Sequence, residues 1–251
     1  MDFSAFKSIP YKQYRNTFLQ NIFVTLHFEP SSSDEDLFRR FDDYTQMFFQ
    51  TDGSKDILHD GAVLTKKDGS LSFVFTKDMV QFTFDGSKYI NYVDSILPQL
   101  SKIQRYVKKV ILRDNIKEIT IRKINSWYFQ EAKNKPINYN DIQNIIFNKQ
   151  LQEALSTEQL TEEEKSIPEF KKAIWKESDS TIEIRTAFIS IPGKKDFYRL
   201  ILDSEYSYKP INTLRLEEVE PQCKAMNKKM FDVFHWCVTP KVIELMDKIG
   251  K

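Results

Sequence analysis

The sequence predicts an α+β protein in which antiparallel strands pack against long helices. Two observations support this: some segments alternate apolar and polar residues, and longer segments repeat apolar residues at helical spacing. The elements follow the order strand, helix, two-strand hairpin and long helix, and this order occurs twice. We therefore expect a first α+β half at residues 1–115 and a second at 116–251, closely packed, related either by duplication or by chance repetition.

The first half contains one half-buried strand, one hairpin and two helices. Residues 21–29 alternate apolar and polar side chains and end at a proline, which predicts the strand. A helical spacing follows over residues 34–48, after a run of serines that can cap it. Residues 51–61 are polar and contain glycine, so we expect a loop. Residues 71–84 alternate around a short turn and predict the hairpin, and residues 88–110 form a long helix.

The second half repeats this order with different residues. A strand is expected at 118–127 and a helix at 138–155, whose apolar residues recur on one face. Residues 181–208 alternate on both sides of a Pro-Gly turn and predict a second hairpin. A helix with a wide apolar stripe spans 217–236, and a last short helix begins at Pro240 after a threonine cap.

Composition excludes some classes of function. The chain has 37 lysines and arginines against 36 acidic residues, so no overall positive field attracts it to nucleic acid or to an anionic membrane. Residues 1–10 lack the apolar run of a signal peptide, and no segment matches a membrane span. Cys223 and Cys237 lie fourteen residues apart on one helix, too far to bridge each other. We expect a cytoplasmic protein with reduced thiols and no membrane partner.

Neither a catalytic motif nor a cofactor motif is recognisable. The three histidines, His27, His59 and His235, show no metal-ligand spacing, and no glycine-rich phosphate loop occurs. We expect no metal, no cofactor and no enzymatic activity. The alternative is an enzyme in which His59 acts with Asp56 or Asp60 in one loop.

Three carboxylates lie on two neighbouring predicted strands. Glu183, Asp203 and Glu205 share one phase of the alternation, so together they could bind a cation. Ordinary solvated charges on an antiparallel sheet explain the same pattern, and we favour this interpretation.

Basic residues gather between the end of the first long helix and the next strand, with aromatic residues nearby. Cations at a helix C-terminus stabilise its dipole, but basic groups interleaved with aromatic rings also bind phosphates and stack on bases. The alternative function is therefore a sensor of a nucleic acid or nucleotide ligand. Its candidate binding residues are Arg105, Lys108, Lys109, Arg113, Arg122 and Lys123.

The closing long helix indicates which face of the sheet is free. Its stripe, which includes Met230, is too apolar to face water, so we expect it to lie across the sheet beside helix 88–110. The opposite face is then open to a partner. We expect Phe23, Thr25 and His27 of the first strand to face that partner.

Several segments resemble a sporadically distributed bacterial family of proteins of unknown function and about 250 residues. The resemblance is carried by TFLQNIFVTLHF (17–28), DGSKYINY (85–92), IRKIN (121–125), LILDSEY (200–206) and FHWCVTPKVIELM (234–246). The family brings no established catalytic residues. Its scattered occurrence implies a mobile defence or toxin-neutralising module, and we therefore expect a non-catalytic binding protein with a protein partner.

Overall fold

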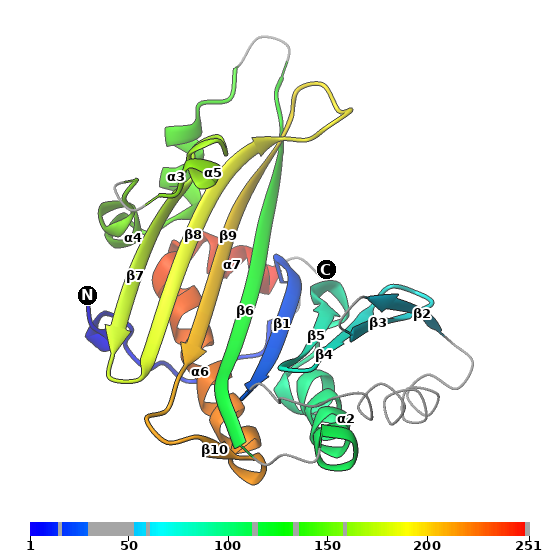
Figure 1. Cartoon of the computed structure of the whole chain (residues 1–251). Coiled ribbons are helices and arrows are strands. Elements are labelled where there is room, and N and C mark those ends of the chain that lie inside the picture. The colour runs from blue at the N-terminus through cyan, green and yellow to red at the C-terminus, as the bar shows by residue number, and fades with distance from the viewer. Residues whose placement is uncertain are drawn as a thin grey trace. The chain divides into compact units, whose positions relative to one another are not determined.

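The computed structural model confirms the α+β class. It describes residues 1–14, 17–29, 53–58, 61–111, 115–132, 136–157 and 160–248, so the helix expected over 34–48 lies outside the described residues. The strands form an antiparallel sheet of ten strands, in the order β2-β3-β4-β5-β1-β6-β9-β8-β7, with β10 paired to β6. The helices and strands of this part of the chain are labelled in Figure 1.

The elements have the following bounds. The strands are β1 (Leu19–Phe28), β2 (Gly53–Leu58), β3 (Gly61–Lys66), β4 (Leu71–Thr76), β5 (Met79–Asp85), β6 (Asn115–Gln130), β7 (Lys171–Glu177), β8 (Ser180–Ser190), β9 (Phe197–Tyr208) and β10 (Leu214–Arg215). The α-helices are α2 (Leu97–Tyr106), α3 (Tyr139–Ile146), α4 (Lys149–Ala154), α5 (Glu162–Lys165), α6 (Val219–Cys237) and α7 (Pro240–Lys248). The short helical turns are η1 (Phe3–Ala5), η2 (Gly86–Lys88), η3 (Tyr92–Ile96), η4 (Val107–Ile111) and η5 (Leu216–Glu218).

The chain forms two compact units, each discontinuous in sequence. Unit 1 comprises Met1–Gln20, Arg122–Tyr206 and Lys228–Lys251, and unit 2 comprises Asn21–Ile121 and Ser207–Asn227. Strands β1, β6 and β9 and helix α6 contribute residues to both units. The expected halves, residues 1–115 and 116–251, are each continuous in sequence, so their bounds differ from those of the two units. A duplication that relates the two halves stays a prediction.

Unit 2 buries one face of its sheet under helices. The strand register aligns Val24, Phe82, Phe73 and Leu64 in one row across four strands, and all four are buried. Tyr106 of α2 packs on the same face, with its ring centroid 4.5 Å from that of Phe75. Because these rings exclude water from this face, β4 and β5 alternate buried with half-buried residues over most of their length.

Two hydrogen bonds join the continuous helical segments η3–α2 and η5–α6 in unit 2. The Tyr92 hydroxyl donates to the Glu220 carbonyl at 3.2 Å, and the Gln104 side-chain amide donates to the Leu216 carbonyl at 3.2 Å. This confirms that the two predicted long helices lie side by side.

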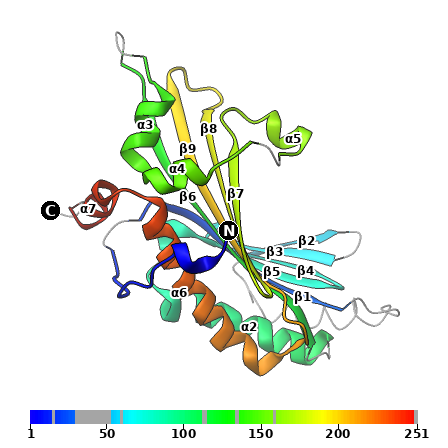
Figure 2. The ribbon, with the colours of Figure 1, turned by 90° about the vertical axis from the view of Figure 1, so that its left-hand side faces the viewer.

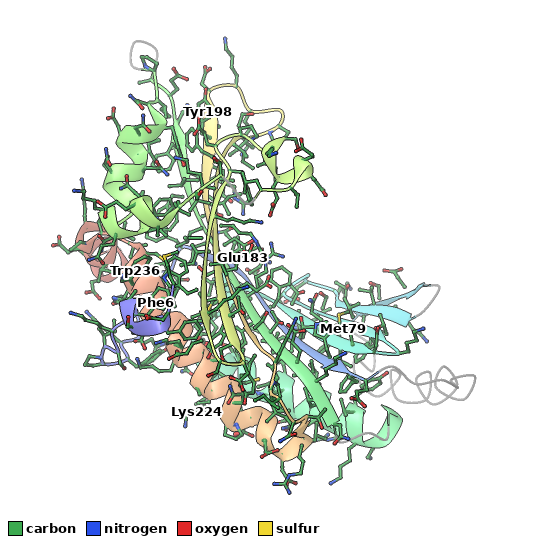
Figure 3. All side chains as sticks on the ribbon, turned by 60° about the vertical axis from the view of Figure 1, so that its left-hand side comes forward. Phe6, Met79, Glu183, Tyr198, Lys224 and Trp236 are labelled. Carbon is green, nitrogen blue, oxygen red and sulfur yellow. The ribbon has the colours of Figure 1, made fainter. Side chains whose placement is uncertain are left out.

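Unit 1 also covers one face of its strands. Trp175 of β7 contacts Trp236 of α6, with ring centroids 5.4 Å apart, and Phe6 packs against both rings. Figure 3 shows Phe6 beside Trp236, and Glu183 on the other side of the strands. Helices α3 and α4 lie on the covered side, whereas the short α5 lies on the opposite side (Figure 2). Among the helices that the structure describes, only α5 therefore lies on the second side of the unit 1 sheet, which we call the open face (Figure 2).

The apolar stripe of α6 is buried as predicted. Cys223, Met226 and Met230 are exposed by 0%, 0% and 2%. Cys223 and Cys237 are free thiols, and burial raises the pKa of both well above the ordinary value for cysteine. In the part of the chain that the structure describes, no helix is long and apolar enough to cross a membrane.

Three expectations about local structure are wrong. The loop expected at 51–61 contains β2, which pairs with β3 because tertiary contacts override its weak strand pattern. The helix expected at 138–155 is broken into α3 and α4, because Phe147 forms a bridge with Val238 between them. The sequence also did not predict β7, because its apolar centre is only three residues long and is flanked by charged residues. This strand pairs with β8.

The pairing of β3 with β4 depends on a close backbone approach at Gly61. A Cβ atom at this position would lie 1.9 Å from the carbonyl oxygen of Phe75. We expect Gly61→Ala to lower the free energy of unfolding by about 3 kcal/mol, because the β3 backbone must move away from β4. Urea denaturation measures this.

Gly69→Ala is the matched control for this prediction. Gly69 has a φ of 69°, and a methyl group added there would meet none of the described atoms within 4 Å, so only backbone strain of about 1 kcal/mol is expected. Equal losses in the two variants would contradict the close-approach explanation.

Candidate binding site on the open sheet face of unit 1

Strand alternation places a set of charged and apolar residues on the open face of unit 1. On β9, Leu200 and Leu202 point to the covered face, so the intervening residues point to the other side. The same alternation applies to β6 and β8. The open face therefore presents Arg122, Ile124 and Ser126 from β6, Glu183, Arg185, Ala187 and Ile189 from β8, and Arg199, Ile201, Asp203 and Glu205 from β9.

A network of ion pairs occupies the middle of this face. Arg122 donates two hydrogen bonds to Asp203, at 2.8 Å from Nε and 2.6 Å from Nη2. Arg185 donates to Glu183 at 2.8 Å, to Glu205 at 3.2 Å and to Asp203 at 3.4 Å. Asp203 is only 6% exposed, and its charge is compensated by two guanidinium groups.

The network keeps both arginines charged. The hydrogen bonds to Asp203 raise the pKa of Arg122 above its usual value. Burial by itself lowers the pKa of Arg185, but the charges of Glu205 and Asp203 outweigh burial, so its pKa is raised. The two neighbours of Asp203 are therefore permanent cations, and the carboxylates serve as their counter-ions.

A pocket of about 430 Å³ lies beside the network. Its apolar wall consists of Ile124, Ile167, Phe170, Ala187, Ile189 and Ile201. Arg122, Arg185, Arg199 and Asp203 line its polar part, together with Thr186. The volume is within the range of ligand pockets, which runs from about 300 to 1,000 Å³.

Arg199 differs from the other two arginines of the pocket. Its Nε donates to the Ser126 hydroxyl at 2.9 Å, and its guanidinium carbon lies 5.8 Å from the ring centroid of Tyr128. Among the described residues, Arg199 pairs with no carboxylate. It is thus a positioned cation with its charge available at one end of an apolar pocket.

The structure does not place the predicted basic residues in one unit. Arg105, Lys108 and Lys109 are exposed in unit 2, whereas Arg122 and Lys123 belong to unit 1. Arg113 lies outside the described residues. Arg105 and Lys108 line a pocket of about 620 Å³ in unit 2, together with Gln104, Arg215, Leu216 and Glu217.

Lys123 lies on the covered face, in phase with the buried residues Asn125 and Trp127 of the same strand. Burial lowers the pKa of Lys123 to about 8. Lys123 and Arg122 are adjacent in sequence but on opposite faces, so they do not act on one ligand.

The three residues expected to face a partner lie on β1 in unit 2. Phe23 and His27 are half-buried, on the phase opposite to the buried Ile22 and Val24. Thr25 is only 5% exposed, and its hydroxyl accepts a hydrogen bond from the Gln81 amide at 2.9 Å. Thr25 therefore offers little surface to a partner.

The histidines and the carboxylates also have defined places. His59 and Asp60 lie outside the described residues, and Asp56 is exposed on β2. His235 lies 2.7 Å from the Tyr14 hydroxyl, and burial lowers the pKa of His235. The three carboxylates that the sequence suggested as a cation site or as solvated charges are partners of arginines instead. No cluster of metal ligands occurs among the described residues.

Sequence reasoning missed Arg185 and Arg199. The alternation of residues 181–208 assigns both arginines to the polar phase of their strands. This phase was the signal in the sequence that could have identified them. Their partners could not be predicted, because these depend on which strands are neighbours and in which register.

Comparisons with known proteins identify no family. No protein-family model matches this chain, and no curated protein matches it. Among solved structures, Methanococcus jannaschii TBP is 12% identical, and the match covers 84% of this chain and 97% of that chain with a TM-score of 0.26. A TM-score this low supports no conclusion about fold or function.

The ion network predicts a large stability effect at Asp203. We expect Asp203→Asn to lower the free energy of unfolding by about 3 kcal/mol, because two guanidinium groups lose a buried counter-ion. Asp247 forms an ion pair with Lys12 in which both side chains are well exposed, so Asp247→Asn is a control with an expected change below about 1 kcal/mol. Urea denaturation of both variants measures the difference, and similar small losses would show that the network is not stabilising.

Proposed function

We propose that this protein is a non-catalytic binding protein, and that its partner docks on the open face of unit 1. The observation that carries the proposal is the pocket of about 430 Å³ in that face, with an apolar wall next to an arginine whose charge is available. Apolar surface that remains open next to fixed polar groups is typical of binding sites.

The state of the carboxylates supports binding rather than catalysis. Asp203, Glu183 and Glu205 each accept a hydrogen bond from an arginine, so they serve as counter-ions rather than as free bases. We propose a protein partner in the cytoplasm, within a mobile bacterial defence or toxin-neutralising module. The support for this setting is the family resemblance of the sequence.

Partner capture from the native host with matched variants tests the proposal. Ile201 lines the pocket, whereas Ile145 is 45% exposed on α3, on the covered side of unit 1. We expect wild type and Ile145→Asp to recover a stoichiometric partner and Ile201→Asp to lose it, because a charge in the pocket opposes apolar docking. Thermal melting confirms that both variants fold.

Two results would contradict this proposal. One is a partner that is retained by Ile201→Asp as well as by wild type. The other is turnover of a substrate by the purified protein without any recovered partner.

A second candidate function is binding of a nucleic acid or nucleotide in unit 2. It is favoured by the pocket of about 620 Å³ that Arg105, Lys108 and Arg215 line, since three cations in one pocket can contact phosphates. One of them, Arg215, also pairs with Glu217 and Glu218 on its own turn, which reduces the charge available to a ligand.

The salt dependence of binding tests this second function. Each phosphate contact releases counterions, so the logarithm of the binding constant should fall with the logarithm of salt concentration. We expect Arg105→Met to reduce that slope by about one unit, and Lys77→Met, a control at an exposed turn residue, to leave it unchanged. Fluorescence anisotropy with labelled single-stranded oligonucleotides measures the slope, and an absence of salt dependence would exclude this function.

A further inference from the structure

We propose that the pocket of unit 1 binds the carboxyl terminus of a partner polypeptide that ends in an apolar residue, and that Arg199 pairs with its carboxylate. This inference rests on the proposed binding function and names the part of the partner that enters the pocket. Three features carry it: the charge of the pocket, the distribution of its apolar residues and the orientation of Arg199.

The charge of the pocket favours an anion at the Arg199 end. Asp203 is the acidic residue among the lining residues, and it already accepts hydrogen bonds from Arg122 and Arg185. Arg199 lies four residues away on the same strand, about 13 Å along β9 at the usual rise per residue. The Asp203 carboxylate is therefore too far away to neutralise Arg199, and a ligand carboxylate can take that place.

The apolar residues lie between the two charged ends. Ile201 separates Arg199 from Asp203 on β9, and Ile124 separates Ser126 from Arg122 on β6. Phe170 and Ile167, which follow α5, complete the apolar wall beside the sheet. A hydroxylated or highly charged ligand would leave polar groups unpaired against these side chains, whereas an apolar terminal side chain would be buried favourably.

Arg199 is oriented before a ligand arrives. Its Nε is engaged by Ser126, which leaves the two terminal amino groups of the guanidinium for a ligand, and the Tyr128 ring lies alongside. A fixed planar guanidinium matches a carboxylate better than a flexible lysine does, because two parallel hydrogen bonds form at once. Fixing the side chain in advance also reduces the entropy lost on binding.

The surroundings favour a polypeptide over a free small acid. The pocket lies on a broad sheet face, next to the half-buried ion pairs of Glu183, Glu205 and Lys172. A small acid would cover only the pocket, while a chain that continues from its carboxyl terminus also covers the charged residues around it.

The test uses the immobilised full chain and hexapeptides with three randomised final positions. One library carries free carboxyl termini and the other carries amides, and mass spectrometry identifies the retained peptides. We expect free-acid peptides with an apolar last residue to be enriched about tenfold or more over the amides. Arg199→Met should abolish this enrichment, because it keeps an unbranched apolar stem but removes the guanidinium group and its charge.

Lys241→Met is the matched control, since Lys241 is an exposed cation on α7, on the covered side of unit 1. It should retain the enrichment, and melting temperatures should show that both variants fold. Equal retention of amides, no retention of either library, or enrichment that survives Arg199→Met would overturn the inference. Calorimetry with octanoate adds a further arm: tighter binding of octanoate than of the best peptide would assign the pocket to a free acid and overturn the polypeptide assignment.

Failure of this inference is distinguishable from failure of the proposed function. One outcome is that Ile201→Asp loses a captured partner while no free-acid peptide is enriched. In that case the partner docks on the open face with a region other than its carboxyl terminus. If free-acid peptides are enriched and depend on Arg199 but no partner is captured, the ligand class stands without the proposed partner.

Discussion

The burial of one face of helix α6 is the constraint on which the rest of the structure depends. Its apolar residues Cys223, Met226, Met230, Val233 and Cys237 are almost completely shielded from water. In unit 1, Trp236 of α6 packs on Trp175 of β7, and in unit 2 the start of α6 is hydrogen-bonded to Tyr92. Because burial of apolar side chains is the main favourable contribution to folding, the face of the unit 1 strands that meets α6 is the buried one.

The charged residues of unit 1 follow from that choice. A guanidinium or carboxylate on the covered face would lose its hydration, so the alternating strands carry these groups on the other face. There Arg122 and Arg185 enclose the buried carboxylate of Asp203, and neighbouring glutamates balance Arg185. Arg122 and Arg185 each have a counter-ion on the adjacent strand β9, while Glu183 pairs with Arg185 within β8.

Arg199 is the exception among the arginines of this face. It is fixed by Ser126 and Tyr128 rather than by a carboxylate, and it lies at the end of an apolar pocket. A stable scaffold of paired charges next to one available cation is an arrangement suited to recognising an anion. Unit 2 has a different concentration of cations, where Arg105, Lys108 and Arg215 line a larger pocket. The two sites differ in chemistry, since one is bounded by apolar side chains and the other mainly by polar ones.

The sequence by itself determined the α+β class, the long helices, the hairpin of β4 and β5 and that of β8 and β9, because these depend on periodicities of about 3.6 and 2 residues within single segments. The same alternation places Arg185 and Arg199 on the polar phase of their strands, although neither was predicted as a site residue. Only the tertiary structure decided that β2 and β7 are strands, since their weak patterns are stabilised by neighbouring strands. It also decided that Arg122 and Lys123 face opposite environments and that Asp203 pairs with two arginines. Such pairings join residues far apart in the chain, and the order and register of the strands, which no local pattern encodes, bring them together.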